Sequence, residues 1–269
     1  MKSSAGGRGA ACLIAAAVLQ AGGAATAAPP SGGEGLRERG IFSVRMEGGP
    51  VWQSRNDTEI PNDGTATRFS ISDLIGSGPS PAARVYLRLN LTGRHSVELL
   101  LAPLTVNGSG TPASDLRFAG EEFEGGVEID AVYRFNSWRA GWNYTFYEGE
   151  RSEFGIGFTA KLRDAKIQLD QHSRTARKTD LGFVPLLHLE GRVGLGAGWM
   201  LLFDADALAG GPGRAEDVSV RFGRDFGRRW RISMGYRMIE GGADVEEVYN
   251  FAWLHYAVVS FQYEYGRGR

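Results

Sequence analysis

The chain has 269 residues and a formal net charge of −1; 42% of its residues are hydrophobic and 23% are charged. This balanced charge argues against a nucleic-acid-binding protein, which needs a basic face. No run approaches the roughly 20 apolar residues of a membrane-spanning helix. Glycine is frequent, with 39 residues, whereas cysteine occurs once and the four histidines are dispersed. Such spacing suits no metal site, so the sequence predicts neither a metal nor a cofactor.

The N-terminus has the features of an export signal. Lys2 and Arg8 precede a short apolar stretch, and Ala25-Thr26-Ala27 has the small-x-small pattern of a cleavage site. An uncleaved anchor is the alternative, but the stretch is too short to cross about 30 Å as a helix. We expect residues 1–27 to be a cleaved signal peptide. The Pro/Gly/Ser-rich residues 28–40 are expected to form a flexible periplasmic segment.

From Ile41 onward, apolar residues recur at every second position. Four runs show the alternation most clearly: residues 84–91, 129–136, 230–238 and 259–265. A period of two predicts β-strands with one apolar and one polar face. In the second of these runs, Tyr133 belongs to the apolar set and Arg134 to the polar set.

Two architectures give this alternation. In a soluble sandwich the apolar face packs against a second sheet, whereas in a transmembrane barrel it faces lipid and the polar face lines the lumen. Clustered aromatic residues at the ends of the apolar runs are typical of membrane-surface girdles; they include Phe146, Tyr147, Trp199, Phe226, Trp230, Tyr263 and Tyr265. We therefore predict that residues 41–269 form an all-β, closed antiparallel transmembrane β-barrel in the bacterial outer membrane.

The connections predict about ten strands. Tight turns are expected at residues 92–94, 149–152, 195–198 and 227–229, and longer connections near 53–66, 122–127, 170–178, 209–214 and 240–248. Four tight and five long connections give an even number of strands, as a closed single-chain barrel requires. The alternation changes phase at Asn136-Ser137, which we interpret as a bulge inside one tall strand. Twelve or eight strands are the alternatives.

Several stretches are similar to sequences of a group of bacterial outer-membrane barrel proteins whose activity is uncharacterised. They are Ala102-Pro103-Leu104, Arg117-Phe118-Ala119-Gly120, and residues 133–139, 182–188 and 249–265. The resemblance implies an outer-membrane barrel and no particular activity. The last stretch also resembles the aromatic-ending signal that the barrel-assembly machinery reads, although residues 266–269 follow its final aromatic.

If the apolar faces contact lipid, a large charged set faces the lumen. Its members are Arg45, Glu47, Arg84, Arg88, Glu98, Glu128, Asp130, Arg134, Arg139, Lys161, Arg163, His188, Glu190, Arg192, Asp204, Asp206, Asp217, Arg221, Arg231, Arg237 and Glu264. Basic and acidic members are nearly balanced, which predicts paired charges, because unpaired charges out of water are costly. This pattern indicates a structural barrel or a narrow pore for small solutes. A porin that attracts anions through Arg84, Arg88, Arg134 and Arg221 is one rival interpretation.

A hydrolase is the second rival. Counting from the turns places His188 opposite residues 204–206, Asp204 and Asp206 near Ser219, and Ser219 opposite Arg237. Serine, histidine and carboxylate close together can generate a nucleophile, as in barrel-embedded lipid A deacylases and omptin proteases. The motifs of those enzymes are not matched here, and an ordinary lumen network is the competing explanation. The sequence commits to no catalytic residue.

Outer-membrane lipid and lipopolysaccharide are the expected partners, together with the barrel-assembly machinery during biogenesis; no nucleic acid is expected. Arg174, Arg177 and Lys178 fall on a predicted external loop, where they are candidates for binding lipopolysaccharide phosphates. An ordinary solvated loop is the alternative.

Overall fold

The computed structural model of the chain describes residues 36, 40–92, 94–210 and 213–266. The predicted signal peptide and nearly all of the predicted flexible segment lie outside these residues. No helix within the described part is long and apolar enough to cross a membrane.

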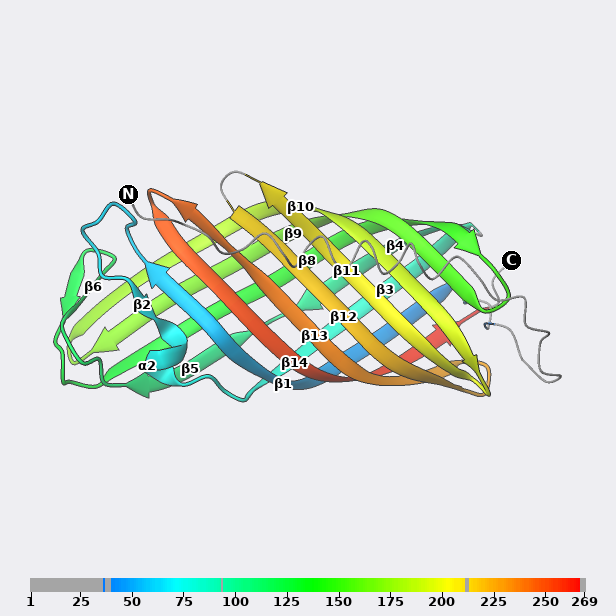
Figure 1. Ribbon diagram of the computed structural model, residues 1–269, viewed down its shortest axis with the longest axis horizontal. Helices are drawn as coiled ribbons and strands as arrows, with labels where there is room; N and C mark the ends of the chain where they lie inside the picture. Colours follow the sequence, from blue (N-terminus) through cyan, green and yellow to red (C-terminus); the bar gives the residue numbers. More distant parts are fainter. Residues whose placement is uncertain (1–35, 37–39, 93, 211–212, 267–269) are drawn as a thin grey trace, which may run out of the picture. The chain divides into compact units, whose positions relative to one another are not determined.

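The described chain forms a closed, ten-stranded antiparallel β-barrel (Figure 1). Its strands are β1 (Phe42–Glu59), β3 (Ser80–Thr92), β4 (His95–Ala102), β8 (Ile129–Glu148), β9 (Ser152–Gln171), β10 (Arg174–Gly196), β11 (Trp199–Gly210), β12 (Gly213–Phe226), β13 (Trp230–Val245) and β14 (Val248–Tyr265). Each pairs with its neighbours in this order, and β14 pairs with β1 to close the barrel. The predicted fold class and strand number are confirmed.

One end of the barrel, which we call the turn end, carries the four tight turns that were predicted. The turn between β10 and β11 is a two-residue hairpin in which Ala197 and Gly198 have φ of +50° and +76°. Positive φ at both central residues is what a type I′ turn requires, and its twist matches that of the flanking strands.

At the opposite end, three predicted long connections are wrong. β9 and β10 continue to Gln171 and Arg174, and β13 and β14 continue to Val245 and Val248, so only two residues join each pair. β11 and β12 likewise extend to Gly210 and Gly213. The truly long connections are two, both containing secondary structure: residues 60–79 with β2 (Phe69–Ser70) and α2 (Ile71–Ile75), and residues 103–128 with β5 (Thr105–Gly110), β6 (Leu116–Phe118) and β7 (Glu121–Phe123).

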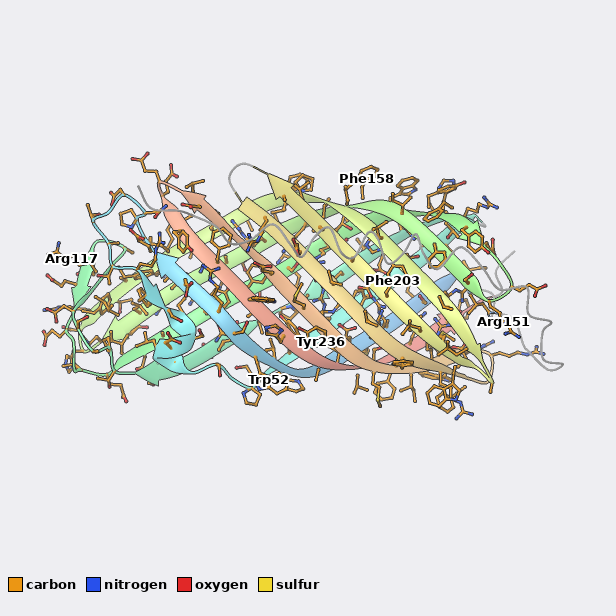
Figure 2. All side chains as sticks on the ribbon, viewed as in Figure 1. Trp52, Arg117, Arg151, Phe158, Phe203 and Tyr236 are labelled. Carbon is orange, nitrogen blue, oxygen red and sulfur yellow. The ribbon has the colours of Figure 1, made fainter. Side chains whose placement is uncertain are left out.

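An apolar belt surrounds the part of the barrel nearest the turn end. Its exposed side chains alternate with inward ones on every barrel strand, as Met46 on β1, Phe158 on β9 and Phe222 on β12 illustrate. Phe158 and Trp52 project from the outer surface (Figure 2). Exposed apolar side chains in a closed ring are what a barrel presents to hydrocarbon. We call the part of the barrel inside this belt the belt half.

Beyond the belt, the outer surface becomes polar. On β9 the outward residues change from Phe158 and Leu162 to Asp164 and Gln168, and on β13 they change from Met238 to Glu240. The remaining part of the barrel, together with residues 60–79 and 103–128, is called the loop half. Its polar outer surface indicates that it extends beyond the membrane into water.

The interior of the loop half is apolar. Ile129, Tyr133, Leu169 and Leu254 are at most 2% exposed and belong to one hydrophobic cluster. The two long connections add side chains to it, including Ile71 of α2 and Leu116, Phe118 and Phe123 of β6 and β7. Helix α2 packs against β5 so closely that a Cβ on Gly110 would lie 1.7 Å from the carbonyl oxygen of Leu74. Both connections therefore fold into the mouth of the barrel.

In the loop half the inner face of the strands is apolar and the outer face is polar, so the interpretation of residues 129–136 must be corrected. β8 pairs with β9 without a register shift from Asp130 to Thr145, so the bulge predicted at Asn136-Ser137 is absent. Instead, Tyr133 points inward and Arg134 outward, the reverse of the prediction. The phase change in the sequence marks the level at which β8 leaves the apolar belt.

Candidate functional site

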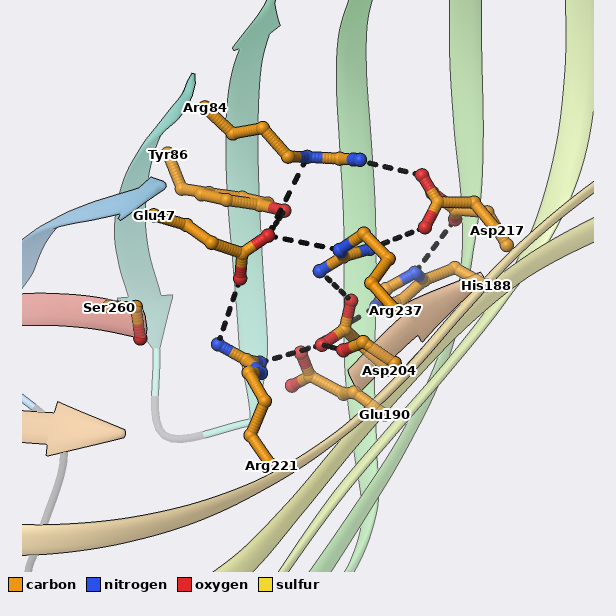
Figure 3. Close-up of polar contacts among 12 residues, drawn as sticks. Glu47, Arg84, Tyr86, His188, Glu190, Asp204, Asp217, Arg221, Arg237 and Ser260 are labelled. Atoms are coloured by element: carbon orange, nitrogen blue, oxygen red, sulfur yellow. Dashed lines mark hydrogen bonds and ion pairs between the residues drawn. The ribbon is translucent and has the colours of Figure 1, made fainter. Parts of the chain in front are cut away.

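A continuous network of buried ion pairs fills the lumen of the belt half (Figure 3). Arg237, which is 1% exposed, lies at its centre and contacts three carboxylates from three other strands. Its Nε donates to Glu47 Oε1 at 2.9 Å, its Nη2 donates to Asp204 Oδ1 at 3.1 Å, and its Nη1 donates to Asp217. One guanidinium thus joins β13 to β1, β11 and β12 across the barrel.

All three carboxylates are shared with further arginines, and Glu47 contacts Arg221 at 3.5 Å and Arg84 at 3.8 Å. Asp217 also accepts hydrogen bonds from Arg84 at 2.8 Å and from Arg139 at 2.6 Å. Asp204 also accepts one from Arg221 at 2.6 Å. Each carboxylate therefore has its negative charge compensated by several donors, which is what burial of a charge requires.

A second layer of pairs lies closer to the turn end. Arg88 donates to Glu98 at 3.0 Å and forms a two-nitrogen contact with Glu190. Arg192 contacts Glu153, and Arg231 contacts Asp225 at 2.8 Å. The contact between Arg88 and Glu190 joins β3 to β10 across the lumen, whereas the other pairs join neighbouring strands.

Little space remains between these side chains. Two cavities in the network have volumes of about 70 and about 30 Å³. Inward glycines do not widen the lumen, because a Cβ on Gly155 would lie 2.6 Å from the side chain of Asn143 and 3.1 Å from that of Glu190. The described side chains therefore close the lumen at the level of the membrane.

Most of the residues expected in the lumen face the interior. They are Arg45, Glu47, Arg84, Arg88, Glu98, Arg139, Lys161, Arg163, Glu190, Arg192, Arg221, Arg231 and Arg237, with Asp217 and Glu264. Asp130 and Arg134 instead lie on the outer face of the loop half, where Arg134 pairs with Asp164 at 2.7 Å. Glu128 is exposed just before β8. They differ from expectation because they lie at the end of β8 beyond the apolar belt, where the outer face of the barrel is polar.

The histidine, carboxylate and serine candidates separate into two groups. The strand registers match expectation, with His188 opposite Asp206 and Asp204 opposite Ser219. His188 Nδ1 lies 2.8 Å from Asp206 Oδ1, while Ser219 Oγ donates to Asp204 Oδ2 at 2.6 Å. Among the described contacts, none joins His188 to Ser219. A serine nucleophile needs a base within hydrogen-bond reach, and Asp204 is already bound by two arginines.

Above the ion-pair network, the loop half contains a chamber of about 680 Å³. Its wall is mainly apolar and is formed by strands β8 to β14, with Tyr133, Phe135, Ile167, Val184, Ile239 and Leu254 among its lining residues. The volume falls within the range of about 300–1,000 Å³ that is usual for small-molecule sites. Lys161 and Arg163 provide cationic groups in the lining.

The chamber opens beside a free strand edge. β10 pairs with β9 along nearly its whole length but pairs with β11 only from Leu187 toward the turn end. Phe183 and Pro185 on the outer face of β10 line the chamber together with Val184 on its inner face. A cavity lined by both faces must pass around the edge of β10. Phe183 is opposite Leu162, so this opening lies at the border between the apolar belt and the polar loop half.

The remaining candidates are dispersed. Arg174 contacts the connection between β4 and β8, Arg177 is exposed on the outer face of β10, and Lys178 lines the chamber. They lie on a strand, not on the predicted loop, and do not form one phosphate-binding cluster. His255 contacts Ser54 and Tyr236 at the upper border of the belt, at distances of 2.7 and 2.5 Å. No group of metal-ligating side chains occurs in the described part of the chain.

Sequence reasoning missed the chamber. Its lining comes from alternate positions that were assigned to the lipid face, such as Tyr133 and Phe135, and from strand ends that were assigned to loops, such as Gly210 and Gly213. The available signal was strand length. β8 has 20 residues, whereas about 9–11 suffice to cross a bilayer.

Solved structures with a similar arrangement of strands include three bacterial proteins. The outer-membrane protease OmpT of Escherichia coli is 8% identical with a TM-score of 0.47, over 82% of this chain and 96% of that one. An outer-membrane channel of Pseudomonas putida F1 is 13% identical with a TM-score of 0.39, over 88% of this chain and 99% of that one. The attachment invasion locus protein Ail of Yersinia pestis is 12% identical, with a TM-score of 0.36 and coverage of 81% and 98%.

The closed antiparallel sheet and apolar belt of this chain are those of a membrane-spanning β-barrel. These features of the chain itself confirm the resemblance inferred from the sequence at the level of the fold. No protein-family model and no curated protein sequence matches the chain. At identities this low the similarity is limited to the strand arrangement, so any function must be argued from the residues of this chain.

Proposed function

We propose that this protein resides in the outer membrane and binds a small apolar ligand in the chamber of its loop half. In this proposal the turn end faces the periplasm and the loop half faces the outside, as is usual for barrels with short periplasmic turns. The observation that carries the proposal is the abrupt change in the interior, from a lumen filled by ion pairs to an apolar chamber of about 680 Å³.

A pore role has less support from the geometry. Arg237, Arg139 and Asp217 meet across the lumen at the level of the belt, and each is at most 6% exposed. A conducting path at this level would require several buried ion pairs to separate, and breaking one such pair costs about 3–5 kcal/mol. The closed lumen makes the chamber accessible from the loop half and from the free edge of β10 only.

Binding of a neutral fluorescent probe such as N-phenyl-1-naphthylamine to the detergent-solubilised full chain tests the proposal. Ala165 lines the chamber, so Ala165→Phe should reduce the affinity at least tenfold by filling the space. Ala140→Phe is the matched control, because Ala140 is exposed in the apolar belt and the added ring contacts detergent. Equal affinities for wild type and both variants would refute chamber binding.

Conductance in planar bilayers tests the pore alternative. The wild-type protein should give no stable ion-conducting steps at moderate voltage, because the ion-pair network closes the lumen. Regular steps that Ala165→Phe leaves unchanged would place the conducting path outside the chamber and would overturn the closed-lumen part of the proposal.

A further inference from the structure

Lys161 occupies an unusual position at the floor of the chamber. It is 3% exposed, lines the chamber and lies on β9 opposite Arg139 of the ion-pair network. Its Nζ is 4.8 Å from the centre of the Phe135 ring. Among the described residues, no carboxylate or other acceptor forms a hydrogen bond or ion pair with this ammonium group. Arg45 also has no carboxylate partner among the described residues. The other buried cations at the centre of the network each have at least one.

The surroundings of Lys161 do not compensate its charge. Arg139 and Arg163 are cationic groups that act on it, and the acid that acts on it is Asp217. Asp217 is already shared by Arg84, Arg139 and Arg237, and Arg163 is paired with Asp180. An ammonium that is buried without a partner is costly. A bound anion would remove that cost, so the floor of the chamber favours the binding of one negatively charged group.

The shape of the site limits which anion fits. At the floor of the chamber the free ammonium of Lys161 matches a monoanion, while the apolar side chains above it, including Phe135, Val184 and Leu254, match an apolar body. The opening beside β10 lies at the border of the belt, the level at which amphiphiles in a bilayer hold their polar groups.

We propose that the chamber binds an amphiphilic monocarboxylate whose carboxylate contacts Lys161 Nζ and whose apolar body lies along Phe135, Val184 and Leu254. This inference rests on the proposed function, which it narrows to one ligand class. A charge-assisted hydrogen bond should give roughly a tenfold or larger preference for the acid over a neutral analogue.

The test compares two fluorescent probes, 11-(dansylamino)undecanoic acid and its methyl ester, on the full chain in nonionic detergent. Wild type should bind the acid at least tenfold more tightly than the ester. Lys161→Met should abolish this preference while leaving ester binding unchanged. Lys161→Arg should retain the preference, because it keeps the cation. Arg177→Met is the control, since it removes an exposed charge from the outer face of β10, away from the chamber.

The possible failures are distinguishable. If the ester binds and Ala165→Phe weakens it, but the acid binds no better than the ester, the chamber binds apolar ligands and the carboxylate assignment is wrong. If neither probe binds, both the ligand class and the proposed function fail. Unfolding without ligand gives an independent check. Lys161→Met should be at least as stable as wild type, whereas clear destabilisation would mean that Lys161 has a structural partner and would overturn the inference.

Discussion

The belt half and the loop half are built from the same ten strands, but their polarity is opposite. In the belt half the outer side chains are apolar and the inner ones form ion pairs, as the adjacent β12 residues Phe222 and Arg221 illustrate. In the loop half Gln168 faces outward and Leu169 inward. The sheet continues unchanged through the border, so the medium outside the barrel determines which face is apolar.

The difference has a simple physical origin. Water surrounds the loop half, so burial of apolar side chains inside the barrel is favourable there, as in a soluble protein. Hydrocarbon surrounds the belt half, so apolar side chains gain nothing by turning inward, and polar side chains are confined to the lumen. The lumen is narrow, and its charges are stable only because they pair across it. The chamber forms above the level at which these pairs end.

The largest effect is expected from removing the central cation of the belt half. Arg237→Ala should reduce the free energy of unfolding by about 3–5 kcal/mol, because Glu47, Asp204 and Asp217 would lose a buried partner. Equilibrium denaturation in lipid vesicles, followed by tryptophan fluorescence, measures it.

In the loop half, Arg117→Ala is the matched control for Arg237→Ala. Arg117 is exposed and pairs with the exposed Glu122 at 3.5 Å, so its loss should change stability by less than about 1 kcal/mol. Similar losses for both variants would contradict the view that the two halves use charge differently.

A second effect follows from the position of the membrane border. Phe158→Arg places a charge in the middle of the apolar belt and should cost about 2–4 kcal/mol. Thr179→Arg places the same charge on the outer face of β10 in the loop half and should change stability by no more than about 0.5 kcal/mol. The same vesicle denaturation assay measures both variants. If both are equally destabilising, the membrane extends farther along the barrel than the belt indicates.

The sequence was sufficient to predict much of the belt half. Its strands show a period of two, its turns are short, and its registers could be counted from those turns. The placement of His188 opposite residues 204–206, and of Asp204 and Asp206 near Ser219, was predicted in this way. What counting could not give is the side-chain geometry, which separates His188 from Ser219 although they lie on nearby strands.

The orientation of the strand faces in the loop half was harder to predict than the strands themselves. Alternation over residues 129–136 shows that two faces differ in polarity, but it does not show which face lies inside. Assigning lipid to the apolar face inverted Tyr133 and Arg134. The chamber also depends on the stagger of strand ends, since it opens where β10 extends beyond its pairing with β11. That offset arises from the three-dimensional pairing and has no local sequence signal.

The smallest expected effect concerns two serine–aspartate pairs, one in each half. Ser219 is fully buried and donates to Asp204 at 2.6 Å, whereas Ser109 donates to Asp130 at 2.6 Å on the exposed surface. Ser219→Ala should reduce stability by about 1 kcal/mol, because Asp204 keeps two arginine donors. Ser109→Ala should reduce it by less than about 0.5 kcal/mol. The vesicle denaturation assay resolves the two.

The same Ser219 variant tests the hydrolase alternative. Since the hydroxyl of Ser219 is bound to Asp204 and has no contact with His188 among the described residues, a fluorophosphonate probe should label neither wild type nor Ser219→Ala. Labelling of wild type that disappears in Ser219→Ala but persists in Ser109→Ala would identify a reactive serine. The ion-pair network would then have to rearrange to bring His188 to Ser219, and the lumen of the belt half would not be the fixed, charge-paired structure described above.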